Sequence, residues 1–184
     1  MSQWNASELS AWAAALHAGQ VCAAPAEGVY GYVADPFNPE ALQRVLKVKN
    51  RVPTKGCIVL IHTFEQLKEL CPPLPSGCTD AIATHWQPGQ PPVTLILPAL
   101  PSLPELLTGG MPTIAVRMPQ VEYMHVYLKA AGQPVVSTSL NLSGEPPVTR
   151  AEDVPSDVPA LTLPDALPGN PSRIFNPVTG MWLR

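Results

Sequence analysis

Pro134-Val-Val-Ser-Thr-Ser-Leu-Asn-Leu-Ser-Gly144 is the stretch of sequence that decides the class of fold. Its apolar beginning, residues 134–137, predicts a short buried strand, and a helical pattern over residues 120–131, closed by Gly132, precedes it. Three hydroxyl groups and an amide follow the strand. Ligands of open α/β sheets bind beyond the carboxyl ends of strands, so the segment predicts a ligand site in an α/β protein. A serine-rich turn that caps the next element is the structural alternative.

Helices and strands alternate along the rest of the chain, which predicts an α/β fold over one domain, residues 1–184. Ser7 and Gly19 are typical of the start and stop of a first helix, and Asn38 followed by Pro39 is typical of the start of a second. Further helices are expected at 63–70 and 79–86, strands at 21–24, 57–61, 92–97 and 113–116, and a hairpin at 173–175 and 181–183. Residues 25–31 are turn-rich. The late hairpin indicates a mixed sheet.

The composition limits the kinds of protein that this chain can be. The 184 residues are 46% hydrophobic and 14% charged, so the chain is apolar enough to fold around a core. Four cysteines form no CxxC pair and four histidines no HExxH motif, which predicts ordinary thiols and no metal held by the protein. Residues 1–24 contain no Lys or Arg, and no apolar run approaches the ~18–20 residues of a membrane span. We therefore expect a cytoplasmic protein without a membrane segment.

Basic residues are concentrated in one place although the net charge is −3. Arg44, Lys47, Lys49, Arg51 and Lys55 are five of the eleven Lys and Arg residues. Such a cluster on an acidic protein favours a small anionic ligand over a long polyanion. An arginine side chain offers a rigid pair of donors and a lysine a mobile charge, and both groups placed where a helix passes into a loop suit a triphosphate. Arg44 and Lys47 also fit a solvated helix face.

Arg117 closes an apolar strand, so it needs a partner, either a ligand carboxylate or a structural Glu or Asp.

The chain has no GxxxxGK[ST], GxGxxG or GxSxG motif. A Walker-type ATPase or a serine hydrolase is therefore unsupported.

Lys49-x-Arg51 and, downstream, Ser139-x-Asn141 resemble the paired KxR and SxN signature of the YrdC/TsaC family. Five more segments resemble family motifs in the same order; they are Pro25–Gly31, Trp86–Thr94, Leu107–Gly109, Thr113–Arg117 and the wider Ser137–Gly144. Each piece is ordinary, but the ordered set is specific and extends over residues 8–184. The resemblance implies a YrdC-like twisted mixed sheet flanked by helices.

The family makes threonylcarbamoyl-AMP and pyrophosphate from L-threonine, bicarbonate and ATP. Other proteins then transfer the threonylcarbamoyl group to adenosine 37 of tRNA. The resemblance thus implies a nucleotidyltransferase that uses ATP, with Mg²⁺ held through the phosphates. It implies as partners the other tRNA threonylcarbamoylation proteins, and tRNA or double-stranded RNA.

The resemblance also assigns residues. ATP would be bound by Arg51, Lys55, Thr113, Ser137, Asn141 and Thr149. Threonine would be bound by Gly28, Lys49, Arg117, Ser139 and Ser172. Catalysis would fall to Lys49, Arg51, Ser139 and Asn141, because a carbamate that attacks the α-phosphorus is an anion approaching an anion and needs its charge neutralised.

Four departures from the family pattern concern the threonine side. Ala26 replaces a Thr, Gly28 stands where many members carry Thr, Leu140 replaces a small Ala, and residues 86–92 contain an insertion. We expect the missing hydroxyls, and a bulky Leu140 close to the ligand, to weaken threonine binding. Restoring Thr at positions 26 and 28 is then expected to tighten it.

Two other functions fit the same residues. The first is a double-stranded RNA-binding or ribosome-maturation protein, against which the acidic net charge counts. The second is a divergent YrdC-like paralogue that keeps the nucleotide site and uses another amine or acyl partner. RNA binding would weaken steeply with salt, whereas a closed ATP pocket would not.

Overall fold

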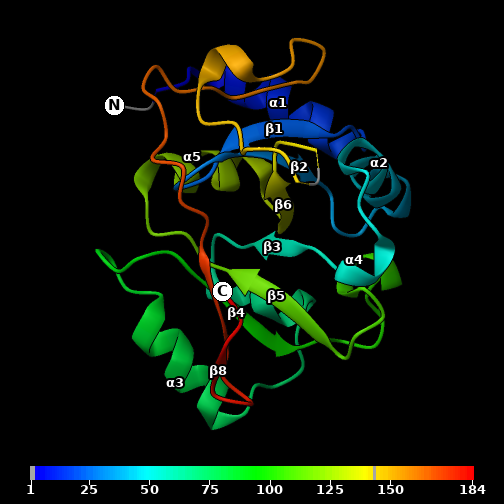
Figure 1. Cartoon of the computed structure of the whole chain (residues 1–184), viewed down its shortest axis with the longest axis vertical. Helices are drawn as coiled ribbons and strands as arrows, with labels where there is room; N and C mark the ends of the chain where they lie inside the picture. Colours follow the sequence, from blue (N-terminus) through cyan, green and yellow to red (C-terminus); the bar gives the residue numbers. More distant parts are fainter. Residues whose placement is uncertain (1–2, 143) are drawn as a thin grey trace.

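Eight strands form one mixed sheet in the residues that the computed structural model describes, 3–142 and 144–184. The order across the sheet is β1-β2-β6-β3-β5-β4-β7-β8 (Figure 1). Pairing is parallel for β3 with β5 and for β4 with β7, and antiparallel elsewhere. The strands are β1 (Cys22–Pro25), β2 (Tyr30–Ala34), β3 (Ile58–Leu60), β4 (Val93–Pro98), β5 (Thr113–Arg117), β6 (Val135–Ser139), β7 (Arg173–Asn176) and β8 (Met181–Trp182). The expected mixed α/β sheet is confirmed.

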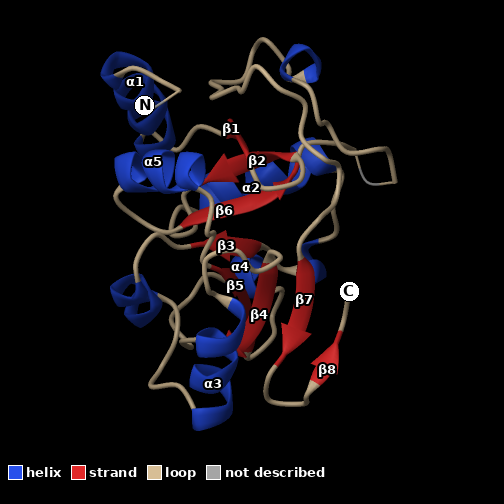
Figure 2. Cartoon of the chain, turned by 90° about the vertical axis from the view of Figure 1, so that its left-hand side faces the viewer, coloured by secondary structure: helices blue, strands red, loops and turns tan. Residues whose placement is uncertain are grey.

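Helices flank this sheet (Figure 2). They are α1 (Ala6–His17), α2 (Pro39–Lys49), α3 (Ser76–His85), α4 (Glu105–Thr108) and α5 (Glu122–Ala131), with 3-10 turns η1 (Pro53–Lys55), η2 (Phe64–Glu69) and η3 (Ala151–Asp153). The Asn38 side chain caps α2 by accepting from the backbone N–H groups of Glu40 and Ala41, and Asn50 ends it in the left-handed conformation. The sequence signals for this helix are therefore confirmed.

Three expected elements differ from the structure. The N-cap of α1 is Asn5 and not Ser7, because Asn5 and Glu8 exchange side-chain and backbone hydrogen bonds in a capping box. Helix α3 begins at Ser76, three residues before the expected Thr79, since Pro75 fixes its entry. The expected helix at 63–70 is the 3-10 turn η2. Ser143, which belongs to the Ser137–Gly144 motif, lies outside the described residues.

Strand β2 was missed because its sequence lacks a two-residue alternation. All five residues of the strand are buried, so polar and apolar positions cannot alternate along it. Its glycine, Gly31, looked like part of a turn. In the sheet, a Cβ on Gly31 would lie 2.9 Å from Ser137 Oγ and 3.2 Å from the Thr138 carbonyl oxygen. Glycine is needed here for the close approach of β6.

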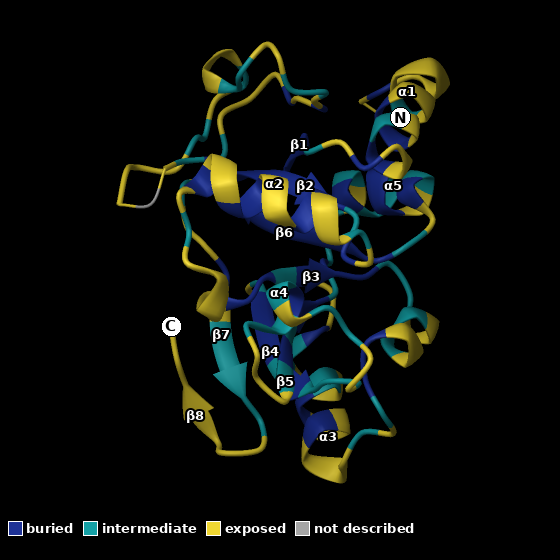
Figure 3. Cartoon of the chain, turned by 90° about the vertical axis from the view of Figure 1, so that its right-hand side faces the viewer, coloured by how far each residue is buried: buried dark blue, intermediate teal, exposed yellow. Residues whose placement is uncertain are grey.

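The two faces of the sheet are covered differently. Side chains on one face, among them Val59, Leu95 and Val116, pack against α2, α3 and α4. The outward side of α2 is exposed (Figure 3). On the opposite face, α1 and α5 cover β1, β2 and part of β3 and β6, through a second core that includes Trp12 and Tyr127. The remainder of that face, over β5 and β4, is left without a helix.

Cys22, Cys57, Cys71 and Cys78 are all buried free thiols. Within residues 3–142 and 144–184, no helix is both long and apolar enough to cross a bilayer.

His62 and His125 form a contact that makes stability depend on pH. Their Nδ1 atoms lie 3.3 Å apart. Burial, His125 and Lys129 lower the pKa of His62 below 6.5. The unfolded chain therefore takes up this proton at a higher pH than the folded chain, so the contact contributes stability above about pH 6.5 and loses it below.

We predict that the urea midpoint falls between about pH 7.5 and about pH 5.5, and that His125→Gln reduces the fall because one of the two like charges is removed. Urea titrations of both proteins at the two pH values measure this. Equal falls in the two proteins would show that the histidine pair does not cause the pH dependence.

Candidate functional site

A cavity of about 430 Å³ lies on the part of the sheet that α1 and α5 leave uncovered. Ile58, Ile96 and Ala115 line it from three neighbouring strands. Alternate positions of the same strands point into the apolar core, as the pleat requires. Residues 170–172 and the chain end, Leu183 and Arg184, line another side of it.

The polar lining of this cavity combines cationic and hydroxyl side chains. Arg51, Lys55, Arg117 and Arg184 line it, together with hydroxyl-bearing Thr113, Ser137, Thr138, Ser139 and Ser172. Burial and the nearby Arg117 and Arg51 guanidinium groups lower the pKa of Arg184. Three arginines are therefore within electrostatic reach of one another. An anion in the cavity would relieve their repulsion.

Arg117, at the end of β5, has a structural carboxylate as its partner. Its Nη2 lies 3.2 Å from Glu27 Oε2, and both side chains are almost wholly buried. Its Nε has no hydrogen-bond partner among the described residues. One side of the guanidinium is thus held by Glu27, while a donor remains unused. Glu27 is thus a structural partner of the kind expected from the sequence.

Arg51 follows α2 and is fixed to the loop that carries Lys55. Its Nη2 donates to the Gly56 carbonyl oxygen at 2.9 Å, and its Nη1 lies 3.5 Å from Thr138 Oγ1. Its Nε is buried and has no partner within the described residues. Like Arg117, Arg51 is held from one side and keeps an unused donor.

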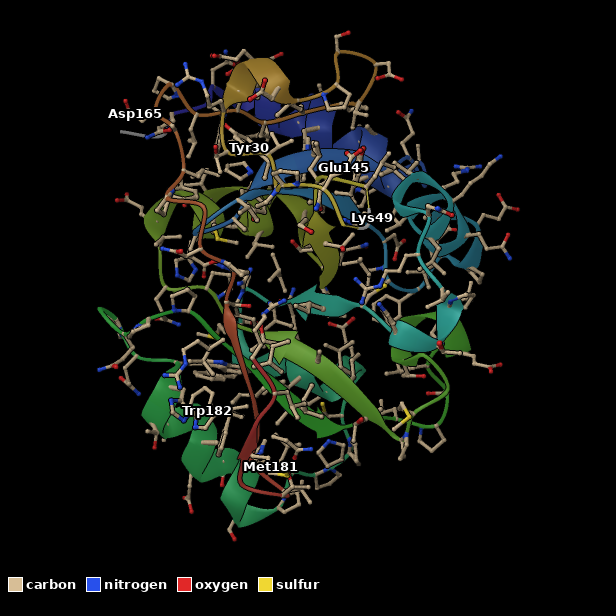
Figure 4. All side chains as sticks on the ribbon, viewed as in Figure 1. Tyr30, Lys49, Glu145, Asp165, Met181 and Trp182 are labelled. Atoms are coloured by element: carbon tan, nitrogen blue, oxygen red, sulfur yellow. The ribbon has the colours of Figure 1, made fainter. Side chains whose placement is uncertain are left out.

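Arg184 reaches the cavity through the β7–β8 hairpin, where Met181 and Trp182 are labelled in Figure 4. Its Nε donates to the Ser172 carbonyl oxygen at 2.9 Å, and its Nη2 lies 3.4 Å from Ser172 Oγ. Ser172 Oγ is also 2.9 Å from the hydroxyl of Thr94 on β4. The three side chains form a connected network along one wall.

Lys49, at the end of α2, holds the loop after β6. Its Nζ lies within hydrogen-bond distance of Ser139 O and Oγ and of Asn141 O and Oδ1. The side chain is buried (Figure 4). Burial and the neighbouring Arg51 lower the pKa of Lys49 to about 8, so the ammonium form with its three donors still dominates at neutral pH. This lysine links the two halves of the KxR and SxN pattern.

The cavity brings together eight of the residues implied by the resemblance, namely Gly28, Arg51, Lys55, Thr113, Arg117, Ser137, Ser139 and Ser172. Lys49, Asn141 and Thr149 are not among the lining residues. Asn141 is tied into its loop, accepting from Lys49 and donating to the Glu145 carbonyl oxygen at 2.6 Å. Thr149 lies further along, where its carbonyl oxygen accepts from Leu167 N–H.

Residues 169–172, the strap, pack against the backbone of Gly28. The Gly28 carbonyl oxygen accepts from Gly169 N–H at 2.7 Å. A Cβ at position 28 would fall 1.7 Å from the Asn170 carbonyl oxygen. The strap therefore occupies the space that a side chain would take. A Thr at this position cannot simply restore a hydroxyl, which overturns that expectation.

Leu140 does not narrow the cavity, contrary to expectation. It is 3% exposed and packs with Ala23, Tyr30 and Tyr32 in a small separate core. Successive residues leaving a strand point to opposite sides, so the side chain beside the cavity-lining Ser139 faces away from the ligand space.

Sequence reasoning missed Arg184 as a cavity residue. Arg117 attracted attention because an arginine closes an apolar strand there. Arg184 follows the apolar residues 181–183 in the same way. No local pattern could show that the hairpin returns to the cavity, because its packing beside β4 is a long-range contact.

Metal-binding side chains do not gather in the part of the chain that the structure describes: no group of three or more His, Cys, Asp or Glu residues could hold an ion there. The cavity itself presents cations and hydroxyls. This donor set suits the oxygens of an anionic substrate and not a bare metal ion.

Comparison with known proteins identifies relatives of this chain. A family model named Sua5/YciO/YrdC, described as telomere recombination, matches residues 14–171. Threonylcarbamoyl-AMP synthase of Hydrogenovibrio crunogenus is 37% identical over 172 residues, which are 90% of this chain and 91% of that protein. Threonylcarbamoyl-AMP synthase of Sodalis glossinidius is 34% identical over 190 residues, covering 100% and 98% of the two chains.

Solved structures share the fold. P. abyssi Sua5 complexed with L-threonine superposes with a TM-score of 0.81 at 29% identity, over 91% of this chain and 50% of that chain, so the present chain spans about half its length. E. coli YciO, at 18% identity, has a TM-score of 0.81 over 95% of this chain and 86% of its own, and supports the fold alone. The long family match and the relatives above 30% identity establish that this chain belongs to the Sua5/YciO/YrdC family.

Proposed function

We propose that the protein is a threonylcarbamoyl-AMP synthase, which forms threonylcarbamoyl-adenylate and pyrophosphate from L-threonine, bicarbonate and ATP for modification of adenosine 37 of tRNA. The observation that carries the proposal is the cationic cavity, with Arg51, Arg117 and Arg184 on its walls. Relatives that align over nearly the whole chain bear this enzyme's name.

The charges of the substrates match those of the cavity. ATP, bicarbonate and the threonine carboxylate are all anions, and the cavity collects four cationic side chains, one of which, Arg117, is paired with Glu27. Arg51 and Arg117 line the cavity, and each guanidinium keeps a buried Nε that has no hydrogen-bond partner among the described residues. Hydrogen bonds between charged groups are the stronger kind, so two such donors favour an anionic ligand.

The chemistry requires two bond-forming steps. The threonine nitrogen first binds the carbon of bicarbonate, losing water and giving a carbamate. A carbamate oxygen then bonds to the α-phosphorus, and the bond to the β-phosphate oxygen breaks to release pyrophosphate. Arg51 and Lys55 would neutralise the phosphates, so catalysis rests on positioning and charge stabilisation without a covalent protein intermediate.

Threonine would bind at the end of the cavity formed by Arg117, Gly28 and Ser172. Arg117 is available for its carboxylate and Ser172 for a hydrogen bond. Thr113 and Ser137 would contact the nucleotide. Lys49 and Asn141 would act indirectly, by holding the loop that presents Ser139. Magnesium would enter with ATP as part of the substrate and neutralise phosphate charge.

The test is a substrate-omission assay. The protein is incubated with ATP, bicarbonate and each amino acid in turn, and pyrophosphate release is measured. Release that requires both threonine and bicarbonate supports the proposal. Release with a different amino acid would instead identify a paralogue with altered specificity, and salt-sensitive RNA binding without any release would favour the RNA-binding alternative.

Arg51→Ala is predicted to weaken ATP binding by about 1.5–3 kcal/mol, the usual value of a lost charged hydrogen bond. Calorimetric titration with ATP measures the change. Arg44→Ala is the matched control, because Arg44 lies on α2, the helix that precedes Arg51, and pairs with Glu40 at the exposed surface. Equal ATP affinity in the Arg51 variant and in the unmodified protein would contradict the assignment.

Lys49→Met is predicted to lower both stability and activity. Removing the ammonium leaves the carbonyl oxygens of Ser139 and Asn141 without this donor, which costs about 1–3 kcal/mol for each buried group. Thermal melting would shift by roughly 2–4 °C for each kcal/mol in a protein of this size. Lys47→Met, on the exposed side of the same helix, serves as control. Lost activity with an unchanged melting temperature would mean that Lys49 acts on the substrate directly.

Gly28→Ala is predicted to weaken threonine binding and lower the melting temperature, because its Cβ must displace the Asn170 carbonyl and with it the strap that carries Ser172. Gly77→Ala is the control, since a Cβ there meets only Pro177 O at an ordinary 3.7 Å. Threonine titrations and melting curves of both variants give the comparison. Tighter threonine binding in Gly28→Ala would show that the strap moves aside without loss.

A further inference from the structure

Thr94 is a buried hydroxyl that the proposed reaction does not use directly. It lies on β4 and is 0% exposed, so it cannot touch a ligand in the cavity. Its Oγ1 is 2.9 Å from Ser172 Oγ, which is its one hydrogen-bond partner among the described residues. Ser172, in contrast, lines the cavity. The Thr94 hydroxyl can therefore act on a ligand only through Ser172.

Counting donors and acceptors fixes the direction of this hydrogen bond. Arg184 can only donate, so where its Nη2 approaches Ser172 Oγ the serine oxygen accepts. The Thr94 hydroxyl hydrogen also needs an acceptor, because an unmade buried hydrogen bond is costly. Ser172 Oγ has two lone pairs and can accept from both. The hydrogen of Ser172 is then left free for another acceptor.

We propose that Thr94 is a positioning residue for the amino-acid substrate: by donating to Ser172 Oγ, it directs the Ser172 hydroxyl hydrogen into the cavity toward a substrate oxygen. This inference rests on the proposed function, and deepens it by naming what orients the threonine side. The substrate group recognised is a hydrogen-bond acceptor, a carboxylate or hydroxyl oxygen. The same serine also fixes Arg184 through its carbonyl oxygen at 2.9 Å.

The geometry also explains why the effect should be confined to one substrate. Arg184 keeps its shorter bond, from Nε to the Ser172 carbonyl oxygen, when the Thr94 hydroxyl is removed. Arg51 follows α2 and Lys55 ends η1, and among the described residues no hydrogen bond joins either of them to Thr94 or Ser172. Loss of the Thr94 hydroxyl therefore disturbs Ser172 Oγ and leaves the phosphate-binding cations in place.

The experiment compares Thr94→Val, which has nearly the same shape without the hydroxyl, with Thr94→Ser, which keeps it. L-Threonine is titrated calorimetrically into each protein, alone and with a non-hydrolysable ATP analogue, and the analogue is titrated separately. We expect the dissociation constant for threonine to rise about tenfold in Thr94→Val, as for one lost hydrogen bond to a ligand-binding group, and to recover in Thr94→Ser. Nucleotide affinity should not change.

Thr84→Val is the matched control, because the exposed Thr84 hydroxyl on α3 donates to the Asp80 carbonyl oxygen and makes no hydrogen bond to the network in the described residues. Unchanged threonine affinity in Thr94→Val would overturn the inference. So would an equal loss of threonine and nucleotide binding that Thr94→Ser does not restore, since that pattern indicates a merely structural threonine.

The two proposals fail in distinguishable ways. An unmodified protein that binds threonine but releases no pyrophosphate would overturn the proposed reaction, and the comparison of threonine affinities would still decide the role of Thr94. An unmodified protein that does not bind threonine would overturn both.

Discussion

The buried ammonium of Lys49 is the contact on which the arrangement of the cavity depends. It joins the end of α2 to the loop after β6 through oxygens of Ser139 and Asn141. Arg51 leaves the same helix end two residues later and turns into the cavity lining. A charge removed from water is tolerated only when it is fully hydrogen-bonded, so the loop cannot move away from the helix without exposing an unpaired charge. One interaction thus fixes both Arg51 and Ser139 in the lining of the cavity.

The cavity exists because the helices cover the two faces of the sheet unequally. Along β5, Ile114 and Val116 enter the core while Thr113, Ala115 and Arg117 face the open side. No helix covers that part of the sheet, so its polar residues are not buried against apolar ones. The strap and the β7–β8 hairpin close the space instead, and they bring Ser172 and Arg184 from the end of the chain. A concave, cationic pocket follows from the strand period and from incomplete helical cover.

The parts predictable from sequence are those set by local chemistry. Neighbouring residues alone determine the caps of α2 at Asn38 and Asn50. They also determine the polar residues at the end of β6. Strand β2 was not predictable, because a strand buried on both faces loses its alternation, and the reason for Gly31 is a Ser137 hydroxyl more than a hundred residues away. The direction of Leu140 and the contact between Gly28 and Asn170 likewise depend on tertiary packing that no local pattern reports.

The departures at positions 26 and 28 therefore have a structural meaning different from a simple loss of hydroxyls. With no side chain at Gly28, the strap approaches until its Asn170 carbonyl fills the vacant space, and the Gly169 N–H bonds to the Gly28 carbonyl oxygen. This places Ser172 against Thr94 and Arg184. Polar contacts to an amino-acid substrate would then come from the strap and the end of the chain, where the missing hydroxyls of the 25–28 loop are replaced by one serine whose hydrogen is directed by a buried threonine.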